Sequence, residues 1–211
     1  MKINECIFSE ETRDGKLRRK LSKKGHGFHR KFYDNSLCRY YLRHKFNKNN
    51  HNTITVIMQN PSFADETGLD ATLNNLREFL NSKYSKDFSA FEVLNLFPIR
   101  TSQSDDLERM HNIHDKQFKH RKKNEEIIRK YINKSSHILL AWGSKYHEYA
   151  KKMIFPLLKG KKLFAYCGLN NDGSPPHFSP YAYIRRNFQE KERILREVII
   201  DKFHNVILQK T

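Results

Sequence analysis

This 211-residue chain has few cysteines, no long apolar run and far fewer acidic than basic residues. Its three cysteines, Cys6, Cys38 and Cys167, are widely separated, which argues against a disulfide framework and against paired-cysteine metal sites. No signal-peptide core opens the sequence, and no hydrophobic stretch approaches the length of a membrane span. A Walker loop and a GxGxxG motif are also missing, which removes the main support for binding a nucleoside triphosphate or a dinucleotide. We therefore expect a reduced, cytoplasmic, soluble protein with no cofactor and no membrane contact.

The excess of positive charge favours a polyanionic partner. Forty Lys and Arg residues against 23 Asp and Glu give a formal net charge of +17, which indicates a nucleic acid first and an acidic membrane surface second. The segment from Lys16 to Lys31 contains no acidic residue, so it is either a disordered basic arm or an arm that follows a phosphate backbone. We expect a basic arm over residues 1–35 and a single domain over residues 36–211. The candidate DNA contacts in the arm are Arg18, Arg19, Lys20, Lys23 and Lys24.

Short apolar runs alternate with segments of helical periodicity through the rest of the chain. Strands are predicted at residues 53–59, 91–96, 137–141 and 163–167. Helices are predicted after Asp70, over residues 120–134, from Ser144 to Leu157 and over residues 187–203. The last helix would turn Ile194, Leu195, Val198 and Ile199 inward. This order is typical of α/β proteins, and we expect a three-layer α/β/α sandwich around a central, mostly parallel sheet of four or five strands.

Unusual polar and aromatic residues follow each predicted strand. Ligands of parallel sheets bind beyond the carboxyl ends of the strands, so we expect the four following loops to meet at one site. The loops are Asn60-Pro61-Ser62, Asn95-Leu96-Phe97-Pro98, Trp142-Gly143-Ser144 and the segment GLNNDGSPPHFSP from Gly168 to Pro180.

Amide, carboxylate and imidazole groups beside a nucleic acid suit the cleavage of an N-glycosidic bond. The oxocarbenium-like transition state needs water oriented near the sugar, a role that we assign to Asn60 with Asp65 or Asp70. We expect His177 to stabilise the charge that develops on the departing base. An extruded base needs a stacking ring and polar groups at its edge. The candidates for base binding are Asn95, Phe97 and Ser62, and the further candidates for DNA contact are Arg100, Ser144 and Ser179.

Each of these residues also has a plainer structural explanation. Asn60 before a proline is typical of a turn, and Asp70 is well placed to cap a helix. Asn95 can satisfy loop backbone, Phe97 can belong to the core, Ser144 can cap a helix, and a lone histidine such as His177 is usually structural. No metal is expected, because the closely spaced histidine pairs lack a carboxylate or cysteine to complete a ligand set.

Several of these segments resemble the uracil-DNA glycosylase superfamily. HILLAWGSKYHEYAKK is similar to its strand that ends in Trp-Gly-Ser before a helix, and PPHFSP occupies the place of its His-Pro-Ser-Pro loop, which supplies the catalytic histidine. MQNPS resembles the motif whose asparagine positions water, and FEVLNLFP the strand that ends in a base-reading asparagine. Phe178 replaces the proline of that loop, and the Gly-Gln-Asp-Pro-Tyr-His motif of the uracil enzymes is missing. The resemblance implies a fold like that of uracil-DNA glycosylase and a monofunctional DNA glycosylase that leaves an abasic site.

The chain also resembles a bacterial and phage family catalogued as domain of unknown function 1643. The motifs Asn-Pro-Ser-x-Ala-Asp, Asp-x-Thr, Asn-Leu-Phe, Trp-Gly and Gly-x-Pro-x-His match residues 60–65, 70–72, 95–97, 142–143 and 173–177 in that order. Some prokaryotic relatives of this glycosylase type are thought to remove enlarged bases from phage DNA, which implies a damaged or hypermodified base as the substrate and a role in antiviral defence. Two other functions remain open: a non-catalytic sensor of modified nucleic acid and an enzyme of free modified nucleotides. We expect duplex or single-stranded DNA as the partner and a monomeric protein.

Overall fold

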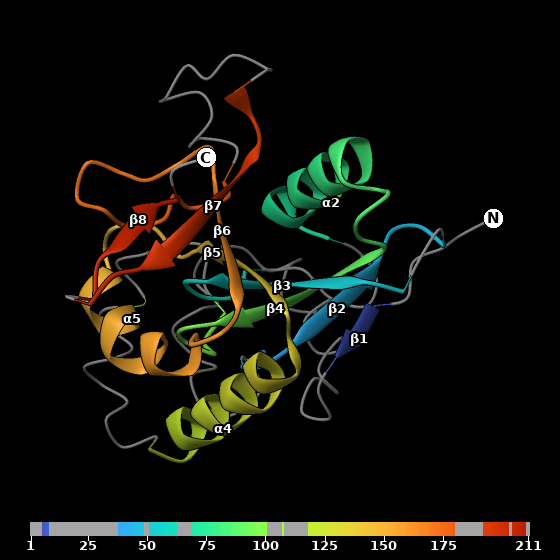
Figure 1. Cartoon of the computed structure of the whole chain (residues 1–211). Coiled ribbons are helices and arrows are strands. Elements are labelled where there is room, and N and C mark those ends of the chain that lie inside the picture. The colour runs from blue at the N-terminus through green and yellow to red at the C-terminus, as the bar shows by residue number, and fades with distance from the viewer. Residues whose placement is uncertain are drawn as a thin grey trace.

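The sheet lies at the centre of the molecule, with helices on both of its faces (Figure 1). A computed structural model describes residues 6–8, 38–48, 51–62, 69–100, 107, 118–179, 192–202 and 204–209. Within these residues, eight strands form one sheet in the order β1-β2-β4-β3-β5-β6-β7-β8. The strands are β1 (Cys6–Phe8), β2 (Leu42–Lys45), β3 (Thr53–Met58), β4 (Ala90–Asn95), β5 (His137–Ala141), β6 (Lys162–Tyr166), β7 (Leu195–Ile200) and β8 (Val206–Leu208). The helices are α2 (Ala71–Lys83), α4 (Phe118–Lys134), α5 (His147–Met153) and the 3-10 helix η3 (Phe155–Leu157).

The four central strands, in the order β4, β3, β5 and β6, run parallel to one another. Each is joined to the next along the chain by a helical crossover, and such a connection places two strands in the same direction. The outer strands pair antiparallel: β2 with β4 and β1, and β7 with β6 and β8. The α/β class is therefore confirmed. The prediction of a mostly parallel sheet of four or five strands is met in part: the four central strands are parallel, but antiparallel outer strands make the sheet larger and mixed.

Apolar side chains of the helices cover both faces of the sheet. The buried residues of α2 are Leu73, Leu76, Phe79 and Leu80, and they pack against one face together with Val56, Met58, Phe91 and Val93. On the opposite face, Ile128 and Ile132 of α4 and Ala150 of α5 pack with Ile57, Leu94 and Leu140. The carboxyl ends of the parallel strands thus form an edge between the two helical layers, beside the first turn of α2.

The helix predicted over residues 187–203 is wrong in the part that the structure describes. Leu195–Ile200 forms β7, which pairs with β6 and with β8. The residues expected on one helical face alternate in the strand, where Val198 is buried and Ile199 is 44% exposed. Three consecutive β-branched residues, 198–200, favour an extended chain, and pairing with the edge of β6 stabilises it.

Of the two predicted helix caps, one is confirmed and one is wrong. The side chain of Asp70 accepts a hydrogen bond from the backbone N–H of Leu73 at 2.9 Å and caps α2. Ser144 does not cap α5, which begins at His147 without a side-chain capping bond. The carbonyl oxygen of Ser144 instead accepts a hydrogen bond from the N–H of His147 at 3.0 Å, which closes a turn before the helix.

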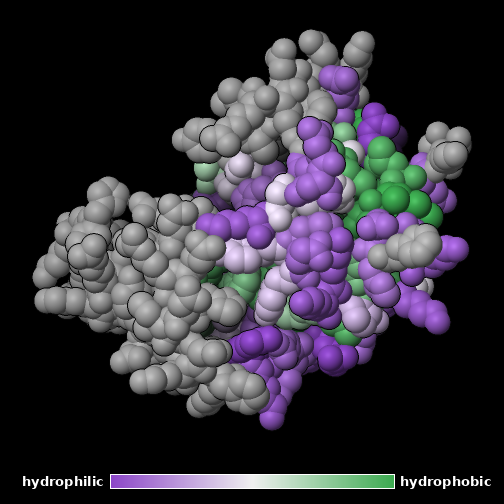
Figure 2. All heavy atoms as spheres, turned by 90° about the vertical axis from the view of Figure 1, so that its left-hand side faces the viewer, coloured by the Kyte–Doolittle hydropathy of each residue, from purple (hydrophilic) through white to green (hydrophobic). Residues whose placement is uncertain are grey.

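Most of the described surface on the α5 side of the molecule is hydrophilic, with a smaller apolar patch beside it (Figure 2). The large apolar side chains that are exposed in the described part of the chain belong to β7 and β8; they are Ile199, Ile207 and Leu208. Among the described helices, none combines the length and the apolar character needed to cross a bilayer.

Candidate functional site at the carboxyl edge of the sheet

The loops that follow the four parallel strands are tied to one another in pairs. After β4, the N–H of Leu96 donates to the carbonyl oxygen of Met58, at the end of β3, at 2.9 Å. After β5, the N–H of Gly143 donates to the carbonyl oxygen of Pro175, in the loop after β6, at 3.0 Å. Because β4, β3, β5 and β6 are neighbours in that order, all four loops lie along one edge of the sheet.

Asn95, the last residue of β4, is fully buried, and neither atom of its amide has a hydrogen-bond partner among the described residues. Side chains alternate along a strand, so Asn95 lies on the same face as Phe91 and Val93, beneath α2. An unpartnered buried amide costs roughly 1–3 kcal/mol. Native proteins rarely keep such a group, and each case calls for a specific explanation. The side chain of Asn95 therefore offers an unused donor and an unused acceptor on the α2 side of the edge.

A second buried asparagine, Asn124 of α4, holds the end of β4 in place. Its Nδ2 donates to the carbonyl oxygens of Asn95 and Leu96 at 3.0 and 3.1 Å. This residue is not among the predicted site residues, although the sequence carries a signal for it. Asn124, Ile128 and Ile132 follow one another at intervals of four, so a polar group lies on the buried stripe of the helix. Asn124 fixes the backbone from which the Asn95 side chain projects.

The imidazole of His177 and the carboxylate of Asp70 are close enough to interact electrostatically. Burial lowers the pKa of His177 below its ordinary value, and the negative charge of Asp70 offsets part of this shift. The ring is therefore neutral at pH 7, and one of its nitrogens donates while the other accepts. Asp70 caps α2, so this interaction indicates that His177 lies near the first turn of that helix. The next residue, Phe178, packs in the core on the α2 side of the sheet.

His177 is held between a glycine turn and an aromatic anchor. Gly143 has a φ of +80°, which favours glycine, and a Cβ at this position would lie 3.4 Å from the Cβ of His177. Phe178 is fully buried, with ring centroids 4.5 Å from Tyr166 and 5.6 Å from Phe79. The close approach of Gly143 and the packing of Phe178 together fix the backbone that carries the imidazole of His177.

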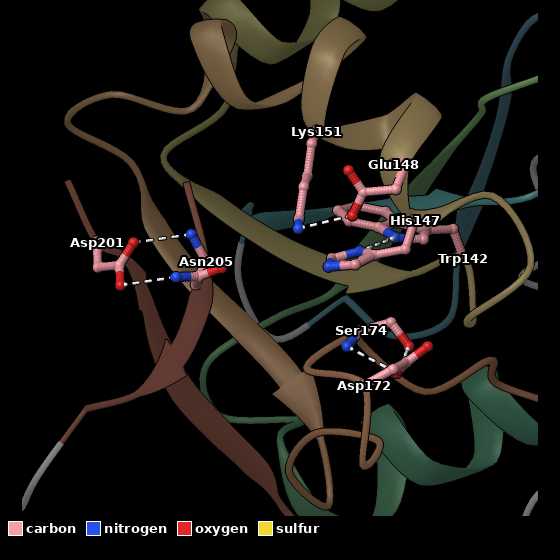
Figure 3. Close-up of polar contacts among 8 residues, drawn as sticks. All are labelled: Trp142, His147, Glu148, Lys151, Asp172, Ser174, Asp201 and Asn205. Atoms are coloured by element: carbon pink, nitrogen blue, oxygen red, sulfur yellow. Dashed lines mark hydrogen bonds and ion pairs between the residues drawn. The ribbon is translucent and has the colours of Figure 1, made fainter. Parts of the chain in front are cut away.

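A network of hydroxyl, amide and carboxylate groups joins the loop after β6 to the loop after β5. The hydroxyl of Ser174 donates to Asp172 Oδ1 at 2.6 Å (Figure 3) and accepts from Nδ2 of Asn170 at 2.7 Å. Its oxygen lies 3.0 Å from the hydroxyl of Ser144, which is exposed. Burial raises the pKa of Asp172, but hydrogen bonds from Ser174 and Ser144, together with the nearby His147, outweigh this effect and leave the pKa below its ordinary value. The network anchors the segment that carries His177.

Behind these loops, the indole N–H of Trp142 donates to Nδ1 of His147 at 3.3 Å (Figure 3). Burial lowers the pKa of His147, Lys151 lowers it further, and Asp172 opposes the shift. Because Nδ1 accepts this bond, the neutral ring carries its proton at Nε2. This buried pair fixes the turn from β5 into α5, and His147 is not among the residues predicted from the sequence.

Phe97, which was predicted to stack on the base, lies on the opposite face of the sheet from Asn95. Phe97 packs into the core on the α4–α5 side, with ring centroids 4.9 Å from Tyr149 and 4.7 Å from Tyr146. Arg100 is only 4% exposed. Ser62 and Ser179 are half-buried, and Asn60 donates from Nδ2 to the carbonyl oxygen of Pro61 at 3.2 Å. Outside the described residues lie Asp65 and the arm residues Arg18, Arg19, Lys20, Lys23 and Lys24.

We name Asn60, Asp70, Asn95 and His177 the edge site. It combines a buried donor and acceptor, a neutral imidazole and a carboxylate at a helix N-terminus. Across the described ranges, no three His, Cys, Asp or Glu side chains gather closely enough to hold a metal ion. These groups are suited to orient a polar ligand and to exchange hydrogen bonds with it.

The chain matches the family described as "Protein of unknown function (DUF1643)" over residues 39–178. It belongs to this family. The DUF1643 match contains the four parallel strands and all four residues of the edge site, whereas β7 and β8 lie beyond it. No curated protein and no solved structure matches the chain significantly.

Proposed function

We propose that this DUF1643 protein is a DNA glycosylase of the uracil-DNA glycosylase type, which removes a damaged or modified base and leaves an abasic site. The observation that carries the proposal is the buried amide of Asn95, which has no partner among the described residues. The edge of a nucleobase presents neighbouring donors and acceptors, and an asparagine amide can pair with such an edge through two hydrogen bonds. Pairing with an extruded base would recover the free energy that the unpartnered amide costs.

The other residues of the edge site supply the remaining groups that the reaction needs. As the bond between the sugar carbon and the base nitrogen breaks, its electron pair moves onto the base, and the neutral imidazole of His177 donates a hydrogen bond to the charge that develops there. The carboxylate of Asp70 is the nearby negative charge that stabilises the oxocarbenium-like sugar. Asn60 orients the water that adds to the sugar carbon and then loses its proton to solvent.

A non-catalytic binder of modified nucleic acid is the second candidate. The Oδ1 of Asp70 accepts a hydrogen bond from the N–H of Leu73 at 2.9 Å, and the Nδ2 of Asn60 donates to the carbonyl oxygen of Pro61 at 3.2 Å. Both side chains that are assigned to the sugar and the water are thus partly engaged by the backbone. This engagement favours recognition of a base without cleavage.

Release of free base from DNA tests the proposal. The purified protein is incubated with phage DNA that carries modified bases and with oligonucleotides that carry damaged bases, and released base is measured by mass spectrometry. We expect Asn60→Ala and His177→Ala to reduce base release by at least about 100-fold while DNA binding is kept. Asn81→Ala and His51→Ala are matched controls, because both residues are exposed and lie away from the carboxyl edge. Both controls should retain full activity.

Two outcomes would count against the proposal. Unchanged turnover in Asn60→Ala and His177→Ala would remove the edge site as the place of reaction. Binding of modified DNA that depends on Asn95, with no base released from any substrate, would favour the non-catalytic binder.

A further inference from the structure

The two helical layers carry very different charge. Residues 69–89, which include α2, hold three Lys and Arg and three Asp and Glu, a net charge of zero. Residues 118–162, which run from α4 through α5 to the start of β6, hold thirteen Lys and Arg and three Glu, a net charge of +10. This layer therefore concentrates positive charge on one face of the sheet, and the opposite layer does not.

Many of the basic side chains in the α4–α5 layer are exposed and form no ion pair with a described carboxylate. Arg121 pairs with Glu125 at 3.1 Å, and Lys162 pairs with Glu197 at 3.4 Å. Six other exposed residues make no ion pair with any carboxylate that the structure describes, and we name them the basic face. They are Lys122, Arg129, Lys130, Lys134, Lys152 and Lys159.

Helices α4 and α5 form one continuous surface. The guanidinium of Arg121, on α4, lies 5.8 Å from the ring centroid of Tyr149, on α5. The Nζ of Lys161 donates to the carbonyl oxygen of Asn133, near the end of α4, at 3.0 Å. Both helices pack on the same core, and both lie on the face opposite to α2 (Figure 1).

Aromatic rings lie under several cations of this layer. The Nζ of Lys130 lies 5.7 Å from the ring centroid of Tyr131, and the Nζ of Lys145 lies 5.8 Å from that of Tyr146. Such contacts are worth about 0.5–1 kcal/mol at an exposed site. They also restrict the side chains, which lowers the entropy that is lost when the cations bind an anion.

We propose that the basic face binds the phosphate backbone of DNA, on the side of the sheet opposite to α2. Lys122 and Lys134 are twelve residues apart on α4, which is about 18 Å along the helix and about the rise of five base pairs. The bonds from Asn124 to the end of β4 place the first half of α4 at the carboxyl edge. The basic face thus begins near the edge site and extends away from it. The inference rests on the proposed function for its choice of DNA as the partner, but not for the chemistry.

An acidic membrane surface fits the basic face less well. A helix that lies on a membrane inserts apolar side chains beside its cations. The apolar residues Ile128 and Ile132 of α4 are fully buried against the sheet. In the part of the chain that the structure describes, the large exposed apolar side chains belong instead to β7 and β8.

The salt dependence of DNA binding by the full-length protein tests the inference. In the basic-face variant, Lys122, Arg129 and Lys130 are all replaced by Gln. We expect binding of a short duplex at about 0.1 M salt to weaken at least about tenfold, and the slope of log K against log salt to become shallower by about 2–3. The control variant replaces Arg77, Lys83 and Lys86 of the α2 layer by Gln, which removes the same charge. It should bind within about twofold of the unmodified protein, with an unchanged slope.

Three results would overturn the inference. The first is an unchanged salt slope in the basic-face variant, and the second is an equal loss of DNA affinity in both variants. The third is that the unmodified protein binds phosphatidylserine vesicles and the basic-face variant loses this binding but still binds DNA. Thermal melts establish that both variants are folded, which their largely exposed positions favour. Base release measured in parallel keeps the two proposals distinct. If the basic face binds DNA but the protein releases no base, only the proposed function is removed. If the protein releases base and the basic-face variant binds DNA as the unmodified protein does, only this inference is removed.

Discussion

Replacing Asn95 by leucine is expected to stabilise the protein while it abolishes recognition at the edge site. Leucine branches at the same carbon as asparagine, so the two amide atoms are replaced by methyl groups in a similar shape. Both amide atoms are buried without a partner among the described residues, and removing such a group recovers roughly 1–3 kcal/mol. Crowding of the bulkier methyl groups against their buried neighbours offsets part of this gain. We expect the free energy of unfolding to rise by about 2 kcal/mol.

Asn124→Leu is the matched control, and its expected effect has the opposite sign. Asn124 is also buried, at 1% exposure, but its Nδ2 donates to the carbonyl oxygens of Asn95 and Leu96 at 3.0 and 3.1 Å. The substitution removes two hydrogen bonds of about 1 kcal/mol each. It also removes the buried Oδ1 of Asn124, which has no partner among the described residues and whose loss returns about 1 kcal/mol, so we expect a net loss of about 1 kcal/mol. The same chemical change at two buried positions thus separates an amide with no partner from one whose nitrogen donates two hydrogen bonds.

Urea denaturation and thermal melts, both monitored by circular dichroism, measure these two effects. For a chain of this size, 1 kcal/mol corresponds to about 2–4 °C, so the melting temperature of Asn95→Leu should rise by about 4–8 °C. Modified DNA should no longer be bound specifically or cleaved by this variant. Equal destabilisation by Asn95→Leu and Asn124→Leu would mean that the amide of Asn95 has partners in the folded protein. That amide would then not be available to pair with a base.

Two further predictions concern the backbone and the pH dependence of stability. Gly143→Ala and Gly160→Ala both place a Cβ at a positive φ, which costs about 1–2 kcal/mol. Only at Gly143 does the added Cβ contact His177. Base release should therefore fall in Gly143→Ala and not in Gly160→Ala. Equal activity of the two variants would contradict the positioning of His177 by the glycine turn. Burial lowers the pKa of His44 from 6.5 to about 4. Between these pH values the unfolded chain binds a proton at His44 more readily than the folded protein does. The contribution of His44 to the free energy of unfolding should therefore be fully present above pH 6.5 and fall by up to about 3 kcal/mol as the pH drops toward 4. Urea denaturation across this range should show a smaller pH dependence in His44→Gln, and identical curves would refute the assignment.

The sequence by itself determined the features of this protein that depend on neighbouring residues. Hydrophobic periodicity placed α2 and α4, short apolar runs placed the four parallel strands, and Asp70 was identified as a possible cap from its position before α2. Because helices between consecutive strands make those strands parallel, the sequence also placed the four polar loops at one edge. These inferences need only the local chain and the rule that joins one element to the next.

Tertiary structure alone decided the features that depend on distant contacts. β7 forms because an extended segment can pair with β6, although its apolar spacing also suits a helix. Phe97 and Asn95 are two residues apart, yet Phe97 packs toward α5, whereas Asn95 lies beneath α2. Whether a buried amide has a partner, and whether basic residues gather on one face, depends on which parts of the chain fold against each other. The spacing of residues along the sequence does not determine which distant residues become neighbours. The unpartnered amide of Asn95 and the basic face therefore follow only from the tertiary structure.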